Sequence, residues 1–356
     1  MTKIAIDCTH FVKGKVGGFE LYLMNLLDGI FELNETAVTL YVRSDQADYF
    51  SKYSKKFTLE FISIKNVYKR ILWQNIIFPF YSLRHSVILF PANFRPLVLF
   101  CKSVTVIHDL QYIYYPGYWS YWKTFYRKVF IPFSIKHSNK VVTISNIVKQ
   151  EIMVNFFRSD IKVIYNPIVL KSFLSRIEDI KYKIPSEPFF LIPSSLLPHK
   201  NIVNLLTAID ELQYYKDVPK FVFVGSYEKK AFYQKHITPH IIVYGYVDIE
   251  HLNLLYRYCK AVILPSVYEG FGMPYVEALV AKKPVVASDI PIAREILKNE
   301  AIYIQKPFNS AKIKTALKKI LSKDFRYTEP AGCNDLLAQT KPSNVAYKYI
   351  SLLNEL

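Results

Sequence analysis

The chain has 356 residues, of which 51% are apolar, and a formal net charge of +17. This length predicts two domains that each bury a core, and because no uninterrupted apolar run reaches 18 residues, no membrane-spanning helix is expected. The four cysteines are far apart and form no C-x-x-C pair, which argues against a disulfide framework or a zinc site and favours a reducing, cytoplasmic compartment.

The N-terminal half alternates apolar, β-branched runs with helical patterns, the arrangement of a parallel α/β domain. The first strand, KIAIDC at 3–8, begins almost at residue 1 and leaves no room for a signal peptide. A helix is predicted over Leu21–Phe31, where the apolar spacing suits a helix. Strands are predicted at 3–8, 38–43, 58–64, 86–91, 103–107, 140–144 and 161–165.

Three glycines, Gly14, Gly17 and Gly18, make the loop between the first strand and the first helix small and flexible. Two adjacent glycines let a backbone approach a ligand closely, because no Cβ stands in the way. A simple strand-to-helix turn is the alternative interpretation.

Residues 51–150 carry 15 Lys and Arg against only Glu60 and Asp109. Within them, the segments 68–84 and 112–140 interleave cations with Tyr, Trp and Phe. Aromatic rings with polar tips and basic side chains suit the surface of an anionic membrane leaflet. Two alternatives remain: the aromatics belong to the core, or the surface binds nucleic acid, for which no motif is present.

His108 and Asp109 end the strand-like segment KSVTVIHD, at the carboxyl edge where α/β proteins bind their ligands. This position favours a substrate contact for His108. Asp109 could orient the imidazole or cap the following turn. Ser145 and Asn146 follow the next strand and are predicted to cap a helix over 147–155.

The C-terminal half opens with a strand at 189–195, followed by LLPHKN and a helix over 202–212. Lys200 lies between them, where a point charge could reach a phosphate group, although an ordinary surface lysine is the alternative. Further buried strands are predicted at 220–226 and 240–247.

The stretch 261–289 reads as strand, glycine-bearing loop, helix and strand. The strand 261–264 ends in a loop that holds Gly270 and Gly272, and Pro274 stands near the start of a helix that extends to Ala281. Backbone N–H groups and the positive end of the helix dipole converge at such a loop, so it predicts an anion site.

Two carboxylates flank this anion site, Glu269 in the loop and Glu277 on the expected first turn of the helix. Because a pure phosphate site prefers cations, the pair suggests acceptors for the hydroxyl groups of a nucleotide-sugar. Either residue alone could equally be a charge that favours the helix N-terminus or faces solvent.

The segment EGFGMPYVE resembles the signature of retaining glycosyltransferases of family 4, the glycosyl transferases group 1. Other pieces follow in that family's order: VGGFE (16–20), VIHDL (106–110), ISNIVKQEI (144–152), VIYNP (163–167), PSSLLPHKN (193–201) and VYGYVD (243–248). The resemblance implies the GT-B fold, an α/β architecture of two Rossmann-like doubly wound domains that face each other across a cleft. It implies an acceptor-binding domain at 1–175, a nucleotide-sugar-binding domain at 186–335, and a helix at 340–356 that crosses back to the N-terminal domain.

The resemblance also implies roles for individual residues. Ser195 stands where the family commonly has an arginine, so His199 or Arg294 could supply the missing cation, and Lys282–Lys283 stand where the family often has a glycine. The implied catalytic residues are His108, Lys200 and Glu269, and the implied donor-binding residues are Gly17, Gly18, Ser195, His199, Tyr246, Val247, Phe271, Gly272, Met273 and Glu277.

The implied activity is retaining transfer of a hexose-type sugar from a nucleotide-diphospho-sugar to a saccharide acceptor, expected to be lipid-linked, in surface polysaccharide biosynthesis. No Asp-x-Asp triplet is present, so neither a metal nor a cofactor is expected. The expected partners are the donor, the acceptor and an anionic membrane surface at the cytoplasmic face, but not nucleic acid. A nucleotide-sugar epimerase on the same fold and a non-catalytic binding module are the alternatives.

Overall fold

The computed structural model describes residues 2–12, 17–33, 37–64, 66–169, 182–212, 218–225, 238–327 and 333–356. The chain divides into two compact units: Met1–Ile168 together with Ala338–Leu356 form the first, and Val169–Leu337 form the second. The sequence places a domain junction between 175 and 186, much of which lies outside the described residues, as does Gly14.

The first unit is built on a parallel sheet in the order β3-β2-β1-β4-β5-β6-β7. The chain adds strands toward one edge from β1 and then returns to add β4 on the other side, so the strand order reverses between β1 and β4. Ligands of open α/β sheets bind beyond the carboxyl ends of the strands at such a reversal. The strands are β1 Ile4–Asp7, β2 Val38–Arg43, β3 Thr58–Ile62, β4 Val87–Phe90, β5 Lys102–Ile107, β6 Lys140–Thr143 and β7 Ile161–Val163.

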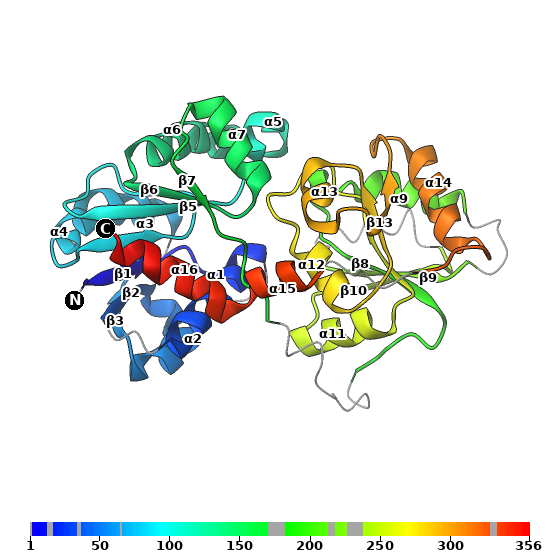
Figure 1. Cartoon of the computed structure of the whole chain (residues 1–356), viewed down its shortest axis with the longest axis horizontal. Helices are drawn as coiled ribbons and strands as arrows, with labels where there is room; N and C mark the ends of the chain where they lie inside the picture. Colours follow the sequence, from blue (N-terminus) through cyan, green and yellow to red (C-terminus); the bar gives the residue numbers. More distant parts are fainter. Residues whose placement is uncertain are drawn as a thin grey trace. The chain divides into compact units, whose positions relative to one another are not determined.

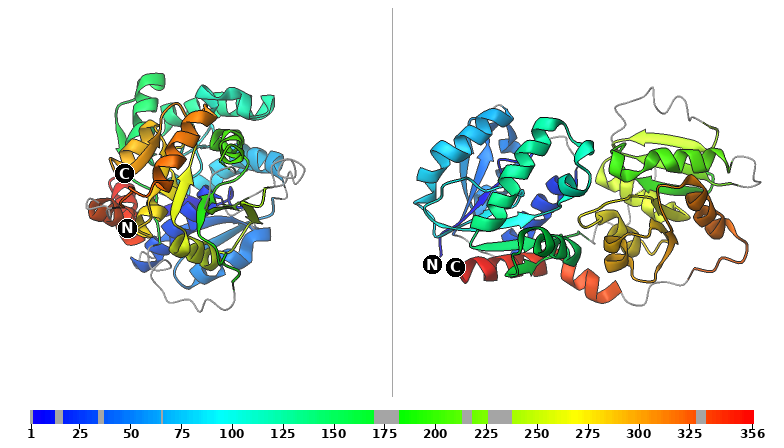
Figure 2. Two further views of the ribbon diagram at one scale, coloured as in Figure 1. Left: turned by 90° about the vertical axis from the view of Figure 1, so that its right-hand side faces the viewer. Right: turned by 90° about the horizontal axis from the view of Figure 1, so that it is seen from above.

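Helices cover both faces of this sheet (Figures 1 and 2). Buried side chains of β1, β4 and β5 pack on one face against η3, α4, α6 and α7. The helical segments of the unit are α1 Gly18–Glu32, η1 Ser44–Gln46, α2 Ala47–Phe50, η2 Ser51–Lys55, α3 Val67–Leu72, η3 Trp73–Ile77, α4 Phe78–Ser82, α5 Gln111–Tyr114, η4 Pro116–Tyr118, α6 Tyr121–His137, α7 Asn146–Phe156 and α16 Pro342–Asn354, with α15 Cys333–Thr340 leading into α16.

The C-terminal helix α16 packs along α1 within the first unit. The buried hydroxyl groups of Tyr22 and Tyr349 join the two helices at 2.9 Å. Gly29 permits the close approach, because a Cβ at this position would lie 2.3 Å from the carbonyl oxygen of Pro342. Any side chain at Gly29 would therefore push α16 away from α1.

The second unit has a parallel sheet in the order β10-β9-β8-β11-β12-β13, so its strand order reverses between β8 and β11. Helices α9 and α14 share a buried core with one face of the sheet, and α11 lies on the other face (Figure 1). Its elements are β8 Phe189–Pro193, η6 Pro198–Lys200, α9 Ile202–Asp210, β9 Lys220–Val224, β10 Ile241–Gly245, α11 Ile249–Tyr258, β11 Ala261–Leu264, α12 Met273–Val280, β12 Val285–Ser288, α13 Pro291–Leu297, β13 Ala301–Ile304 and α14 Ser310–Leu321.

The strands predicted from the sequence are all present, and their bounds differ from the prediction by at most two residues at either end. Helix α1 begins three residues earlier than predicted, because Gly17 is the extended residue that precedes its first turn. Ser145 caps α7 as predicted, since its side chain accepts a hydrogen bond from the Val148 N–H at 3.2 Å.

Two further features of the fold concern segments that the sequence analysis singled out. The basic, aromatic segments form helices over 67–82 and 121–137, and their rings divide between the core and the surface. Lys282 adopts a left-handed φ of +53° after α12, a conformation that costs a non-glycine residue about 1 kcal/mol.

Candidate functional site

In the second unit, the loops that follow β8 and β11 come together where the strand order reverses. The carbonyl oxygen of His199 accepts a hydrogen bond from the Val267 N–H at 2.8 Å. The buried side chain of Asn201 donates to the Pro265 carbonyl at 3.1 Å. These bonds fix the two loops against each other, at the place where an α/β sheet offers its ligand site.

Lys200 and Glu269 form an ion pair at this position, with 2.6 Å between Nζ and Oε1. Their side chains are only 17% and 14% exposed. Burial acts to raise the pKa of Glu269, but the charges of Lys200 and His199 and hydrogen bonds from Lys200 and Ser266 outweigh it and leave the pKa lowered. Glu269 is therefore a carboxylate at neutral pH, and Lys200 keeps two further N–H donors for an anion.

The N-terminus of α12 adjoins this ion pair, and its geometry requires a glycine. Gly272 has a φ of +75°, and a Cβ there would lie 2.3 Å from the Tyr275 ring. Pro274, two residues further along the chain, has no backbone N–H group that could be left without a hydrogen-bond partner. Gly272, Pro274 and Tyr275 line a small pocket together with Lys200 and Glu269.

Tyr275 is a residue of this pocket that the sequence analysis did not single out. It is 1% exposed, and its hydroxyl group has no hydrogen-bond partner among the described residues. Burial and the charge of Glu269 raise its pKa, so the hydroxyl stays protonated and able to donate. Its position directly after Pro274 and three residues after Gly272 was the signal that the sequence offered.

Glu277 lies on the second turn of α12 rather than on the first, because the helix begins at Met273. It is 7% exposed and accepts a hydrogen bond from the Tyr256 hydroxyl at 2.7 Å. Burial raises its pKa, although Tyr256 and the charge of Lys200 oppose the change. Glu277 is thus not the solvated helix-end charge that the sequence left open.

The raised pKa of Glu277 predicts a pH-dependent stability change in the variant Glu277→Gln. The charged form costs free energy in the folded state, so the variant should unfold at a higher temperature at pH 7, by roughly 2–4 °C for each kcal/mol. Below the ordinary pKa near 4.5 the carboxyl is protonated in both states, and the gain should vanish. Thermal melts at pH 7 and pH 4 test this, with the exposed Glu32→Gln as control. An equal gain at both pH values would show that charge is not the cause.

The other residues assigned to the donor lie on neighbouring loops. Ser195 lies in the loop after β8, and Phe271 and Met273 are buried at the start of α12. Tyr246 and Val247 follow β10, two strands from β8, which places them about 10 Å along the sheet edge.

Arg294, one of the two candidate replacements for the missing cation, is held by an acidic neighbour. Its guanidinium donates to both carboxylate oxygens of Asp289, at 2.6 and 2.8 Å, and stacks on the Tyr303 ring. His199 is the other candidate, and its charge acts directly on Glu269. His199 therefore lies close enough to Glu269 to act as that cation when its ring is protonated.

In the first unit, His108 follows β5, beside the point where the strand order reverses. Its Nε2–H donates to the Pro91 carbonyl at 2.6 Å, and its backbone N–H donates to the Asn93 side chain at 2.7 Å. The Tyr22 ring contacts the imidazole edge-on, with 4.8 Å between centroids. Burial lowers the pKa of His108, so the ring is neutral at pH 7 and carries its acceptor lone pair on Nδ1.

The structure shows which of its two possible roles Asp109 has, and where Gly17 and Gly18 lie. Asp109 caps the turn that follows, since its Oδ1 accepts from the Gln111 N–H at 3.1 Å. Gly17 is the residue before α1, and Gly18 is the first residue of that helix. A Cβ at Gly18 would meet no heavy atom within 4 Å. Asn93, whose side chain accepts the hydrogen bond from the His108 N–H, was not identified from the sequence, because it lies 15 residues earlier in the chain.

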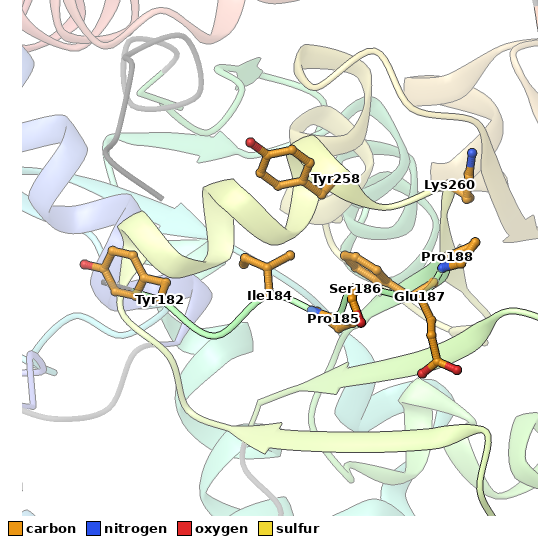
Figure 3. A pocket seen from close by; sticks show the side chains of 9 residues that line it. Tyr182, Ile184, Pro185, Ser186, Glu187, Pro188, Tyr258 and Lys260 are labelled. Atoms are coloured by element: carbon orange, nitrogen blue, oxygen red, sulfur yellow. The ribbon is translucent and has the colours of Figure 1, made fainter. Parts of the chain in front are cut away.

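A wider pocket opens at the amino edge of the second sheet (Figure 3). It is lined by Phe189 at the start of β8, by Lys260 before β11, and by Tyr258 and the segment 184–188. Ligands of parallel sheets bind at the opposite, carboxyl edge, so we assign it no donor role.

Two kinds of feature are absent from the described ranges. No three His, Cys, Asp or Glu side chains in the described ranges are grouped to hold a metal ion. None of the helices in the part of the chain that the structure describes has the length and apolar composition needed to cross a bilayer.

The chain is similar to known proteins in sequence and in structure. Residues 176–331 match the family described as glycosyl transferases group 1. The O-antigen chain mannosyltransferase RfbU of Salmonella typhimurium is 30% identical over 227 residues, which cover 62% of this chain and 60% of that protein. The matched segments span about half to three fifths of the length of the first curated relatives.

Solved structures resemble the chain over its whole length. The crystal structure of Anabaena Alr3699/HepE in complex with UDP-glucose has a TM-score of 0.75 at 17% identity and covers 100% of both chains. The structure of WaaG, a glycosyltransferase involved in lipopolysaccharide biosynthesis, has a TM-score of 0.68 at 14% identity and covers 99% of this chain and 98% of that one. At these identities the likeness concerns the fold, which is GT-B. Residues 176–331 thus match the glycosyl transferases group 1 family, and the whole chain shares the GT-B fold of these solved structures.

Proposed function

We propose that the protein is a retaining glycosyltransferase that moves a hexose-type sugar from a nucleotide-diphospho-sugar to a saccharide acceptor. The observation that carries the proposal is the largely buried Lys200–Glu269 pair beside the N-terminus of α12. A cation and a helix N-terminus suit a diphosphate, and an adjacent carboxylate suits the hydroxyl groups of a sugar. The names of RfbU and WaaG support an acceptor in surface polysaccharide biosynthesis, such as a lipid-linked O-antigen or capsule precursor.

The departing diphosphate sets the chemical requirement of the reaction. Negative charge develops on the bridging oxygen as the glycosidic bond breaks, so fixed donors at that oxygen lower the barrier. Lys200 would supply an ammonium, and Tyr275 would supply a hydroxyl that is already desolvated. We propose that these groups act without a metal, so an excess of EDTA should leave the rate unchanged.

The carboxylates have binding roles in this proposal. Glu269 would accept hydroxyl groups of the transferred sugar, and Glu277 would accept those of the ribose. The acceptor would attack on the face that the diphosphate leaves, and the departing phosphate would take the acceptor's proton. A covalent glycosyl-enzyme trapped on either carboxylate would refute this mechanism.

A thermal-shift panel of UDP-, GDP- and dTDP-sugars tests donor binding. A ligand at one hundred times its dissociation constant stabilises the folded state by about 2.7 kcal/mol, which is easily measured. We expect one nucleotide class to raise the melting temperature of the wild type, and the shift to be much smaller in Lys200→Ala. If no nucleotide-sugar raises it at millimolar concentration, the proposal fails.

Incubation of the selected donor separates transfer from the alternatives. NMR of donor alone over hours should show no change in the sugar, whereas an epimerase would convert it without an acceptor. With acceptor present, the new glycosidic bond should keep the anomeric configuration of the donor. A bound donor that never reacts with any saccharide would instead indicate a binding module.

A further inference from the structure

The helical segment α3–η3–α4 of the first unit exposes apolar side chains on its outer side. Tyr68, Leu72, Ile76 and Phe80 recur every four residues and are 57–84% exposed. The inner side of the segment is already filled by buried rings such as Trp73. The outer side chains therefore do not contribute to the core of this unit.

Helix α6 repeats this arrangement. Tyr121, Trp122 and Phe125 are 54–75% exposed, whereas Ile131 and Ile135 of the same helix are buried against the sheet. The exposed positions fall in the first two turns and lie on one side of the helix, since residues three and four apart are neighbours.

These two outer sides point away from the same face of the sheet. Phe90 of β4, which packs against α4, is paired with Thr105 of β5 and so points to the same side as Ile107, which packs against α6. Arg70 of α3 and Tyr126 of α6 are close enough to influence each other's pKa.

The loop between β4 and β5 contacts both helical segments. Its Leu97 N–H bonds to the Asn75 side chain of η3 at 2.9 Å, and its Phe94 ring contacts the Tyr126 ring of α6, with 5.0 Å between centroids. Its Phe100 is 54% exposed and contacts the Phe80 ring. We name the resulting surface the outer apolar face, represented by Leu72, Ile76, Phe80, Phe100, Trp122 and Phe125.

The charge around this face has one sign. Residues 66–137 contain nine Lys and Arg and a single acid, Asp109. Lys69, Lys123 and Lys128 are exposed on the same helical segments, and Arg84, which pairs with Glu60 at 3.9 Å, is exposed just after α4. Contiguous exposed apolar patches rimmed by polar residues mark interaction sites, and a cationic rim selects an anionic partner.

We infer that the outer apolar face docks on an anionic lipid bilayer, with its aromatic and aliphatic side chains in the interfacial region and its lysines over the headgroups. Tyr and Trp suit this region because one end of each ring is apolar and the other polar, and basic side chains are attracted by anionic lipid. A second copy of the chain would bring two cationic rims together, and the like charges would repel. The inference does not depend on glycosyl transfer, because it concerns vesicles without donor or acceptor.

Trp122 is the natural reporter for the experiment. The chain has three tryptophans, of which Trp73 is buried, Trp119 is half-buried and Trp122 is 75% exposed. Vesicles of 70% phosphatidylcholine and 30% phosphatidylglycerol should shift the fluorescence to shorter wavelength, and brominated phosphatidylcholine in them should quench it. Both effects should be much smaller in Trp122→Phe and with vesicles of phosphatidylcholine alone.

Flotation with the same anionic vesicles measures the binding itself. Leu72→Ser/Phe80→Ser should bind at least tenfold more weakly, because each large apolar side chain contributes roughly tenfold when it is buried. The matched control, Val203→Ser/Phe308→Ser, removes two exposed apolar side chains from the second unit and should bind like the wild type. Trp122→Ser changes a different helix and should also weaken binding, so one unfolded variant does not decide the test.

Two outcomes would overturn the inference. Vesicle binding by both double variants that equals the wild type would show that the outer apolar face is not the contact. A dimer in lipid-free light scattering that becomes a monomer in Leu72→Ser/Phe80→Ser would show that a second copy covers the face.

Discussion

Replacing Lys200 with alanine is expected to lower kcat/KM by two to three orders of magnitude, with most of the loss in kcat. If Lys200 stabilises the departing diphosphate, its contribution is made mainly in the transition state, where removal of one such group costs about 3–4 kcal/mol. The same change leaves Glu269, 14% exposed, without the cation 2.6 Å away. The variant should therefore also melt at a lower temperature than the wild type.

Steady-state kinetics at saturating donor separates these two effects. Lys314→Ala is the matched control, since it breaks an ion pair with Glu211 in the same unit, and it should keep the wild-type kcat. Circular dichroism below the melting temperature verifies that Lys200→Ala is folded. A folded variant that retains more than a tenth of the wild-type kcat would exclude Lys200 from the leaving-group site.

Replacing Glu269 with glutamine is expected to lower kcat/KM by roughly ten- to a hundredfold. Glutamine keeps the shape and one acceptor oxygen but loses the charge, and a hydrogen bond to a charged group is stronger than a neutral one by about 1–2 kcal/mol. An ion pair with Lys200 can no longer form, so the ammonium would be held less firmly. Kinetics with a donor and its deoxy-sugar analogue tests the role of Glu269, because the variant should discriminate less between them.

The pH dependence of stability gives an independent test of the same residue. The pKa of Glu269 is lowered in the folded state, so the carboxylate stabilises the protein above its ordinary pKa near 4.5, and this is lost as the pH falls through the folded value. Glu269→Gln should thus be less stable than the wild type at pH 7 and should approach it in acid. The sign is opposite to that expected for Glu277→Gln. The same sign in both variants would contradict the difference between their environments.

Much of the fold could be predicted from local patterns. The β-branched runs that end at Ile107 and Leu264 are parallel strands, because such runs suit a strand buried on both faces. The glycine and proline of the following loop indicated where α12 starts to within one residue. The helices over 67–82 and 121–137 were missed because apolar residues occupy both their inner and outer sides, and this removes the helical period.

The candidate site was predictable in its residues but not in its contacts. Lys200 and Glu269 were each identified from their own loops, yet their pairing depends on β8 and β11 being neighbours across 69 residues of sequence. Tyr256 and Asn93 were invisible for the same reason, since Tyr256 bonds to the Glu277 side chain and Asn93 to the His108 backbone from other elements or loops. Glu277 looked like a helix-end charge because nothing near it in sequence reveals its burial.

By itself the sequence determined the alternation of strands and helices, the glycine-bearing anion loop and the unequal charge of the two halves, since each follows from residues close together in the chain. Only the tertiary structure decided which loops meet where the strand orders reverse, which carboxylate is paired and which is buried, and which aromatic side chains face outward. The reason is physical: periodicity and turn chemistry act over a few residues, whereas pairing, burial and exposure depend on strand order and packing between elements far apart in sequence.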